Sequence, residues 1–365
     1  MDMKEGWEIR RFDEIMTPAR VERCGDRTDL PILSITMRSG IVEQRDRFSK
    51  TIASVDRSNY KIVKDGQLVI AFPIDEGLVY TQDVAKEGIM SPAYNIWDVD
   101  YSLVNRNFLV SYFHSRFAFD YYKAKLRGST QRRRSMDKED LLSMPIPVPP
   151  ISEQKRIVEE LDLLNGIIEK NKTQLEELDK LAQSIFYDMF GDPKINELGW
   201  DSESFSNLFL LKSGDSLSAK EFEEGIYPVY GGNGIAGYHN KYNKEGDYII
   251  IGRVGVYCGN VRIVSNKFWL TDNAFELIMR KDAFNKSFLS YLLNIMNLNQ
   301  YANHAAQPVI SNVVLKEINV PVPSLFLQQE FADKISAIEA MKEKVRKSLA
   351  EAEQLFNSRM DFYFN

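Results

Sequence analysis

The residues that could catalyse a reaction or bind a metal are few and widely separated in this 365-residue sequence. Its histidines are His114, His239 and His304, and its cysteines are Cys24 and Cys258. None of them has the short spacing of zinc ligands, and two thiols alone cannot fill a four-ligand site. The phosphate-loop pattern GxxxxGK[ST] does not occur. The sequence therefore predicts no catalytic group, no metal site and no cofactor site.

A basic segment in the first half carries side chains suited to nucleic acid. Residues 126–135 read LRGSTQRRRS, in which a glycine, small hydroxyls and an amide accompany four arginines. Arginine binds phosphates and guanine edges, and glutamine pairs with adenine. The alternative is a solvated basic loop. The candidate DNA-binding residues of this segment are Arg127, Ser129, Thr130, Gln131, Arg132, Arg133 and Arg134.

A second basic segment of the same half spans residues 38–50, RSGIVEQRDRFSK. Its Arg45, Arg47 and Lys50 are further candidates for contacts with DNA phosphates. The segment could equally be an exposed hairpin that binds nothing.

A glycine-rich and aromatic segment marks the second half. Residues 230–244 read YGGNGIAGYHNKYNK, and such a loop lets the backbone approach a ligand closely. Its glycine spacing does not match a dinucleotide fingerprint, and no helix is expected after it. Tyr230, Asn233 and Lys241 are its candidate DNA contacts.

Three more candidates follow in that half. Arg253 ends a predicted buried strand, where an arginine is either an ion-pair partner or a residue that reads a ligand. Gln307 and Ser311 repeat the spacing of Gln131 and Ser135 in the first basic segment. We therefore include Arg253, Gln307 and Ser311 among the predicted DNA-binding residues.

The net charge of −6 is concentrated in one region of the chain. Residues 151–192 hold 5 Lys and Arg against 10 Asp and Glu, whereas the other regions are close to balanced. A balanced domain can still present a basic face, so charge neither supports nor excludes binding to DNA.

Two stretches of about 40 residues have the apolar heptad pattern of a long helix that buries one narrow stripe. Each stretch follows a Pro-Val-Pro sequence, and the two copies of PVP are 174 positions apart. The simplest arrangement is a coiled coil between the two helices, although each could instead pack on a globular domain. The predicted seam comprises Ile157, Leu161, Leu164, Ile168, Leu175, Leu178 and Ile185 in the first helix, with Ile335, Ile338, Val345, Leu349 and Phe356 in the second.

The segments before the two helices also look like copies, so the chain reads as a tandem repeat of globular part and helix. The predicted boundaries are 1–148 for the first globular domain, 149–192 for the central helix, 193–323 for the second domain and 324–365 for the last helix. No apolar run is long enough to span a bilayer, and the N-terminus has no secretory signal. We therefore expect a cytoplasmic chain without a structural disulfide.

Five stretches give this chain a family resemblance over its whole length. They are MPIPVPPISEQKRIVEELD (144–162), LAQSIFYDMFGDP (181–193), GWDSESFSNL (199–208), YPVYGGNGIAGY (227–238) and IIIGRVG (249–255). With them the sequence resembles the specificity subunit of type I restriction–modification systems. The second helix departs from that pattern at its entry, where SLFLQQ (324–329) replaces the usual PISEQ.

The resemblance implies an α+β fold with two α/β target-recognition domains, separated by two long antiparallel helices in a coiled coil and related by a pseudo-twofold internal repeat. Each domain would read one half of a split, asymmetric target in double-stranded DNA. The helices would set the spacing and dock two copies of the methyltransferase subunit, which would bind S-adenosylmethionine. Restriction and translocase subunits would be further partners, and this chain would be a non-catalytic subunit without a cofactor.

Two other functions are compatible with parts of the sequence. A coiled-coil adaptor with two protein-binding modules would need no DNA, although the arginine-rich and glycine-rich segments argue against it. A methyltransferase would need a complete catalytic motif, and SPAY at residues 91–94 lacks the second proline of such a motif.

Overall fold

The structure is a computed structural model that describes residues 6–37, 39–47, 56–72, 74–127, 135–303 and 307–365. The chain forms two compact units. Unit 1 contains residues 1–172 and 347–365, and unit 2 contains residues 173–346. Each of the two long helices therefore contributes one half to each unit.

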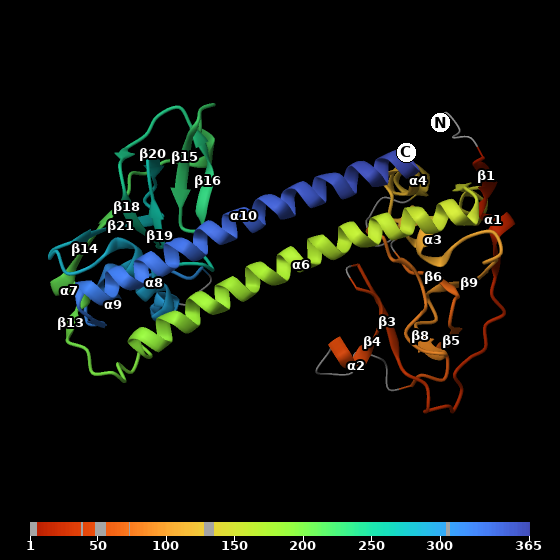
Figure 1. The fold of residues 1–365 in the computed structure, drawn as a ribbon, viewed down its shortest axis with the longest axis horizontal. Coiled ribbons are helices and arrows are strands. Elements are labelled where there is room, and N and C mark those ends of the chain that lie inside the picture. The colour runs from red at the N-terminus through yellow and green to blue at the C-terminus, as the bar shows by residue number, and fades with distance from the viewer. Residues whose placement is uncertain (1–5, 38, 48–55, 73, 128–134, 304–306) are drawn as a thin grey trace. The chain divides into compact units, whose positions relative to one another are not determined.

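The long helices are α6 (Ile151–Phe190) and α10 (Leu325–Phe364), each 40 residues long (Figure 1). Their bounds lie within two residues of the predicted helical segments. In unit 1, Glu160 contacts Arg359, and Asn171 lies opposite Ser348. As residue numbers rise along α6, the numbers of the facing residues on α10 fall, which confirms the predicted antiparallel pairing.

Unit 2 repeats this antiparallel pairing with other residues. Asp179 contacts Lys342 across the helix pair, and Phe186 packs against Phe331 with ring centroids 5.5 Å apart. All predicted seam residues are buried or partly buried. Buried positions are Ile157, Leu161, Leu164, Ile168, Leu178, Ile338 and Val345, and partly buried ones are Leu175, Ile185, Ile335, Leu349 and Phe356.

Polar residues within the seam have partners on the facing helix. Asn171 Nδ2 donates a hydrogen bond of 3.1 Å to Ser348 Oγ in unit 1. In unit 2, Lys342 Nζ lies 2.6 Å from both Asp179 Oδ1 and Glu339 Oε1. Burial lowers the pKa of Lys342, but these two carboxylates raise it by more, so the ammonium stays charged. Such pairs favour one register of the coiled coil.

Replacing Glu160 with glutamine should destabilise the helix pair of unit 1 by less than about 1 kcal/mol at pH 7. The Arg359 guanidinium lowers the pKa of the Glu160 carboxyl, and the Tyr363 hydroxyl adds to this effect. A carboxyl with a lowered pKa stabilises the fold above its unfolded pKa of 4.5 and loses that contribution as the pH falls through the folded value. Urea unfolding of both proteins should therefore show a stability difference at pH 7 that shrinks below about pH 4.5. A difference that stays constant down to pH 3 would contradict this role.

The globular part of unit 1 is built on a four-stranded antiparallel sheet. Its strand order is β2 (Met16–Pro18), β9 (Asn95–Val99), β6 (Leu68–Ile70) and β7 (Val79–Thr81). The unit also contains two-stranded pairs, which are β1 (Glu8–Arg11) with β12 (Pro145–Val148), β3 (Leu33–Thr36) with β4 (Gly40–Glu43), β5 (Lys61–Lys64) with β8 (Glu87–Met90), and β10 (Leu126–Arg127) with β11 (Ser135–Met136). The helical elements are α1 (Phe12–Ile15), α2 (Gln44–Arg47), η1 (Ile74–Glu76), α3 (Arg106–Phe113), α4 (Arg116–Lys125) and α5 (Lys138–Leu142).

Unit 2 contains a sheet of the same order, with β14 (Phe209–Ser213), β21 (Ala274–Met279), β18 (Tyr248–Gly252) and β19 (Val261–Val264). A second sheet has the order β16 (Gly234–His239), β15 (Tyr227–Gly231), β20 (Lys267–Leu270) and β17 (Lys244–Glu245), and β13 (Ser202–Ser204) pairs with β22 (Asn319–Pro321). The helical elements are α7 (Phe205–Leu208), η3 (Ala219–Glu221), α8 (Lys286–Ile295), η4 (Leu298–Tyr301) and α9 (Asn312–Leu315). The matching strand orders confirm the internal repeat.

The ends of the long helices belong to the cores of the globular parts. In unit 1, Ile157 and Leu161 of α6 and Phe364 of α10 are buried in one cluster with Phe108 and Tyr112 of α3. In unit 2, the buried cluster includes Phe186 and Phe190 of α6 with Phe331 of α10 and Phe288 of α8. Large aromatic side chains dominate both contacts, so each helix end is fixed to its unit by apolar packing.

A buried glutamine also fixes the start of each long helix. Gln154 accepts a hydrogen bond of 2.6 Å from the Asn105 backbone N–H and donates to the carbonyls of Leu103 and Pro149. Asn105 also caps α3 with its side chain. Gln154 therefore links the start of α6 to the start of α3. The glutamine thus satisfies three backbone groups that would otherwise be buried without partners.

Gln328 makes the same three kinds of bond at the start of α10. It accepts from the Asn285 backbone N–H and donates to the carbonyls of Ala283 and Pro323. Asn285 caps α8 as Asn105 caps α3. Both glutamines are fully buried. SLFLQQ (324–329) differs from PISEQ (150–154), but it keeps the glutamine that makes these three hydrogen bonds.

Candidate nucleic-acid interface

Three segments of unit 2 that contain predicted DNA-binding residues meet at the end of β18. The backbone of Arg253 donates to the Asn273 carbonyl and accepts from the Ile310 N–H, each at 2.9 Å. Next to it, the Gly255 N–H donates to the Pro308 carbonyl. The structure thus brings Arg253 together with the segment that contains Gln307 and Ser311.

The glycine-rich segment approaches the same place through its backbone. A side chain at Gly232 would place its Cβ 2.1 Å from the Val254 carbonyl oxygen, and one at Gly252 would lie 2.2 Å from the Gly232 carbonyl oxygen. These glycines therefore serve close contact between two loops of the protein. The close approach of a ligand to this segment stays a prediction, and the backbone after β18 is the described neighbour of Gly232.

The Arg253 side chain is held in place without a carboxylate partner among the described residues. Its guanidinium carbon lies 5.3 Å from the centre of the Phe275 ring, and its Nη1 donates weakly to the Asp272 carbonyl at 3.4 Å. Its Nε is buried and has no hydrogen-bond partner in the part of the chain that is described. The ion-pair alternative for Arg253 is thus not seen there, and its reading of a base stays a prediction.

The other candidates of unit 2 differ in how far they are exposed to solvent. Tyr230 of β15 is partly buried against Phe268, and Asn233 is exposed in the turn between β15 and β16. Lys241 and Gln307 are exposed in loops, and Ser311 is the exposed N-cap residue of α9. Each can reach solvent, as a contact with DNA requires.

The arginine-rich segment of unit 1 is described only at its ends, which are Leu126, Arg127 and Ser135. Arg127 of β10 forms ion pairs with Asp137 at 2.8 Å and Asp140 at 3.4 Å, so its charge is partly neutralised. Ser129, Thr130, Gln131, Arg132, Arg133 and Arg134 lie outside the described residues. The prediction for those six residues stays a prediction.

The other basic segment of unit 1 is described only in part. Arg45 lies in α2 with an exposed side chain, and its Nε is 2.6 Å from Glu43 Oε2. Arg47 ends α2, but its side chain lies outside what the structure describes, as does the whole of Lys50. The contacts of these residues with DNA remain predictions.

An apolar turn beside Arg253 was missed by sequence reasoning. Val256 and Tyr257 are 75% and 59% exposed at the tip of the loop between β18 and β19. The Cys258 N–H donates to the Gly255 carbonyl, which closes the turn, and Asn299 donates to the carbonyls of Val256 and Cys258. The exposure of these apolar residues is what marks the turn, and it can be recognised only in the folded structure.

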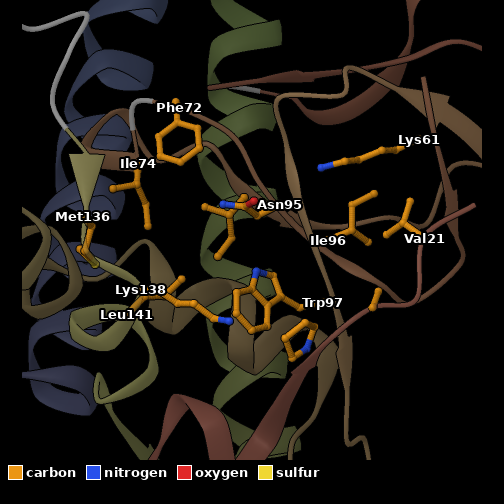
Figure 2. A pocket seen from close by; sticks show the side chains of 13 residues that line it. Val21, Lys61, Phe72, Ile74, Asn95, Ile96, Trp97, Met136, Lys138 and Leu141 are labelled. Atoms are coloured by element: carbon orange, nitrogen blue, oxygen red, sulfur yellow. The ribbon is translucent and has the colours of Figure 1, made fainter. Parts of the chain in front are cut away.

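A pocket of about 460 Å³ in unit 1 was also missed (Figure 2). Segments that are far apart in the sequence line it, from β2, β5, β6, the chain after β6, β9, β11 and α5. Its lining includes Lys61, Phe72, Asn95, Trp97, Met136 and Lys138. No local sequence motif predicts the pocket, because the residues that line it are far apart in the sequence.

Two further properties of the described ranges bear on the function. None of the helices in those ranges is both long and apolar enough to cross a bilayer. Within the same ranges, no three His, Cys, Asp or Glu side chains are grouped as a metal ion would require.

The sequence matches a family model described as "Type I restriction modification DNA specificity domain" over residues 4–180 and again over residues 197–354. The EcoprrI type I restriction enzyme specificity subunit of Escherichia coli is 29% identical over 199 residues, which are 52% of this chain and 49% of that protein. The chain thus spans about half the length of this curated relative. The MjaVIII specificity subunit of Methanocaldococcus jannaschii is 22% identical, covering 96% of this chain and 90% of that protein.

The fold is similar to that of a solved type I restriction–modification S subunit from M. genitalium, with a TM-score of 0.62 and 17% sequence identity. That comparison covers 99% of this chain and 97% of the other. It supports the two-unit fold with paired long helices, and the two matches of the family model coincide with the two copies of the internal repeat. The chain therefore belongs to the family of type I restriction–modification DNA specificity domains.

Proposed function

We propose that the chain is the non-catalytic DNA-specificity subunit of a type I restriction–modification system. One half of a split, asymmetric target would be read by each globular part. The observation that carries this proposal is the pair of homologous sheets with different side chains at equivalent strand ends. Arg253 follows the central strand β18 in unit 2, and Phe72 follows the central strand β6 in unit 1. One scaffold with two different contact surfaces suits a target whose halves differ.

The equivalence of these two positions follows from the sheet register. Ile70 of β6 pairs with Asn95 and Val79, and Ile251 of β18 pairs with Phe275 and Val261. Both isoleucines point into the core that contains the helix ends. Two residues further along the chain, Phe72 and Arg253 occupy matching places.

The partners of the chain belong to the same proposal. Double-stranded DNA would bind the globular parts, and two methyltransferase subunits would bind along the helices and supply S-adenosylmethionine and catalysis. Restriction and translocase subunits would join this assembly. Exposed apolar residues on the helices, among them Leu163 and Ile167 of α6 and Met341 of α10, support binding of protein partners there.

Binding to duplex DNA at several salt concentrations separates this function from that of a protein-binding adaptor. The complex of the chain with its methyltransferase should bind a target-containing duplex, with an affinity that falls as salt rises because phosphate contacts release counterions. A matched duplex with scrambled half-sites should bind much more weakly. Equal binding to both duplexes, or no binding, would favour the adaptor.

A length change in the helices should alter the target in one specific way. Inserting seven residues into both α6 and α10 preserves the heptad and lengthens each helix by about 10 Å, at ~1.5 Å per residue. The gap between the half-sites should then grow by about three base pairs, at ~3.4 Å per base pair, while the bases read stay the same. Sequencing of methylated sites in a host that carries this variant measures the gap. An unchanged gap would contradict the role of the helices as a spacer.

A further inference from the structure

The pocket of unit 1 lies where the homologous place in unit 2 holds Arg253. Phe72 matches Arg253 by the sheet register, and both follow the central strand of their sheet. Met136 precedes the N-cap residue of α5 and Ile310 precedes that of α9, and Ile310 bonds to the Arg253 backbone. The position of Phe72 in the pocket wall of unit 1 is therefore taken by a cationic side chain, Arg253, in unit 2.

The walls of the pocket suit a flat aromatic ligand. Phe72 is 45% exposed, and Trp97 is buried with its ring 4.9 Å from that of Phe12. Ile96 and Met136 add further apolar surface (Figure 2). Pockets of this size, mostly apolar with a few polar groups, are typical of sites for small ligands.

One buried polar group in these walls bears on the choice of ligand. Trp97 is only 5% exposed, and its buried Nε1 has no hydrogen-bond acceptor among the described residues. A buried donor without an acceptor is costly, so a ligand that supplies a carbonyl oxygen or a ring nitrogen would be favoured. The edges of nucleobases carry such acceptors.

Two lysines give the pocket a preference for an anion. Lys138, at the start of α5, lines one side, and Lys61, at the start of β5, lines another (Figure 2). Lys61 donates a hydrogen bond of 2.5 Å to the Tyr94 carbonyl, and burial together with the charge of Arg23 lowers its pKa. A nearby phosphate would offset this loss of solvation, because an opposite charge stabilises the ammonium.

We propose that this pocket binds a single nucleotide, with its base against Phe72, a base acceptor facing Trp97 Nε1, and its phosphate near Lys61 and Lys138. The proposal rests on the proposed function, because the source that it favours is a nucleotide of the bound DNA. A base inside a stacked duplex shows only its edges in the grooves. A pocket bounded by a sheet and α5 can take the whole base only after that base has left the stack. A free nucleotide has the same chemistry and is the other source.

The experiment uses the complex of the full chain with its methyltransferase. The probes are duplexes that contain the methylated target, with 2-aminopurine placed in turn at each purine position. Fluorescence of 2-aminopurine increases when the base leaves the stack. Besides any increase at the methylated positions, we expect one at a position in one half-site only. Phe72→Ala should reduce that increase about tenfold, since stacking of a base on an aromatic ring accounts for such a factor.

Two further variants keep the test independent of folding defects. Lys138→Gln changes an exposed residue, and Trp97→Phe keeps the aromatic ring but removes the N–H; both should weaken the same signal. Ile9→Ala is the matched control, because Ile9 is 44% exposed in unit 1 and does not line the pocket. It should leave the signal unchanged.

A second arm titrates free 2-aminopurine nucleotide into the complex without DNA. Saturable binding that Phe72→Ala abolishes, with no increase at unmethylated positions of the duplex, would identify a free nucleotide as the source. An increase at an unmethylated position that Phe72→Ala and Lys138→Gln leave intact would overturn the proposal, as would the absence of signal in both arms. If the wild-type complex does not bind its target selectively, the proposed function fails, which is a separate result.

Discussion

Replacing Arg253 with alanine is expected to weaken binding to the DNA target by about 5- to 150-fold. This range corresponds to the ~1–3 kcal/mol that a specific arginine contact with a base contributes. The loss should be confined to the half-site read by unit 2, because Arg253 lies at the end of β18 in that unit. Its side chain stacks on Phe275, and its buried Nε has no hydrogen-bond partner among the described residues, so the guanidinium is positioned before any ligand binds.

The measurement for Arg253 is the affinity of the complex with the methyltransferase for duplexes with base changes at each half-site position. The variant should lose discrimination at one position of one half-site and keep its discrimination at the other half-site. Arg346→Ala is the matched control, since Arg346 is an exposed arginine of α10 in the same unit that pairs with Glu339 and Glu343. An equal loss for both variants, or a loss at both half-sites, would contradict a reading role for Arg253.

Replacing Gln328 with leucine is expected to lower the free energy of unfolding of unit 2 by about 3 to 5 kcal/mol. Leucine is similar in size, but it leaves the Asn285 N–H and the carbonyls of Ala283 and Pro323 without their partner. Each buried backbone group without a partner costs ~1–3 kcal/mol. The starts of α8 and α10 should lose protection together.

Urea unfolding gives the total effect, and hydrogen exchange of the full chain localises it. The neighbouring Gln329 offers a matched control, because its exposed side chain bonds to the side chains of Asn285 and Asp333. Gln329→Leu should cost less than about 1 kcal/mol. The expectation for Gln154→Leu in unit 1 is the same as for Gln328→Leu. Similar losses for Gln328→Leu and Gln329→Leu would show that the buried bonds do not fix the helix entry.

The long helices and the internal repeat could be predicted from the sequence because their signals are periodic and local. Alternating steps of three and four between apolar residues identify one stripe on a helix. The shift of 174 positions carries Gln154 onto Gln328, and the structure gives both the same bonds. Two of the three partners of each glutamine could not be predicted, since they lie more than 40 residues away.

Local sequence similarity alone does not align the strands of the two copies correctly. Aligned on Gly66 and Gly246, Ile70 would match Ile250. The structure instead places Ile70 and Ile251 in the equivalent cores, while Ile250 faces the second cluster. A shift of one residue moves a strand residue to the other face, and only the pairing with neighbouring strands decides it.

A similar shift affects the short helices α5 and α9. The Gln and Ser spacing suggested that Ser311 matches Ser135, but the residue that occupies the N-cap of α5 is Asp137. The pocket with Phe72 and Trp97 could not be predicted at all, because its residues come from segments scattered over residues 18–141. Contacts at this separation depend on the folded sheet rather than on any local pattern.

Sequencing of methylated positions in the genome of a host that carries this chain and its methyltransferase tests the central claim most directly. The two repeated units with different contact residues predict a target of two unlike half-sites separated by a fixed gap. The methylated motif should disappear when this chain is removed and the methyltransferase is kept. A motif without a gap, a palindromic motif, or methylation that does not depend on the chain would contradict the account.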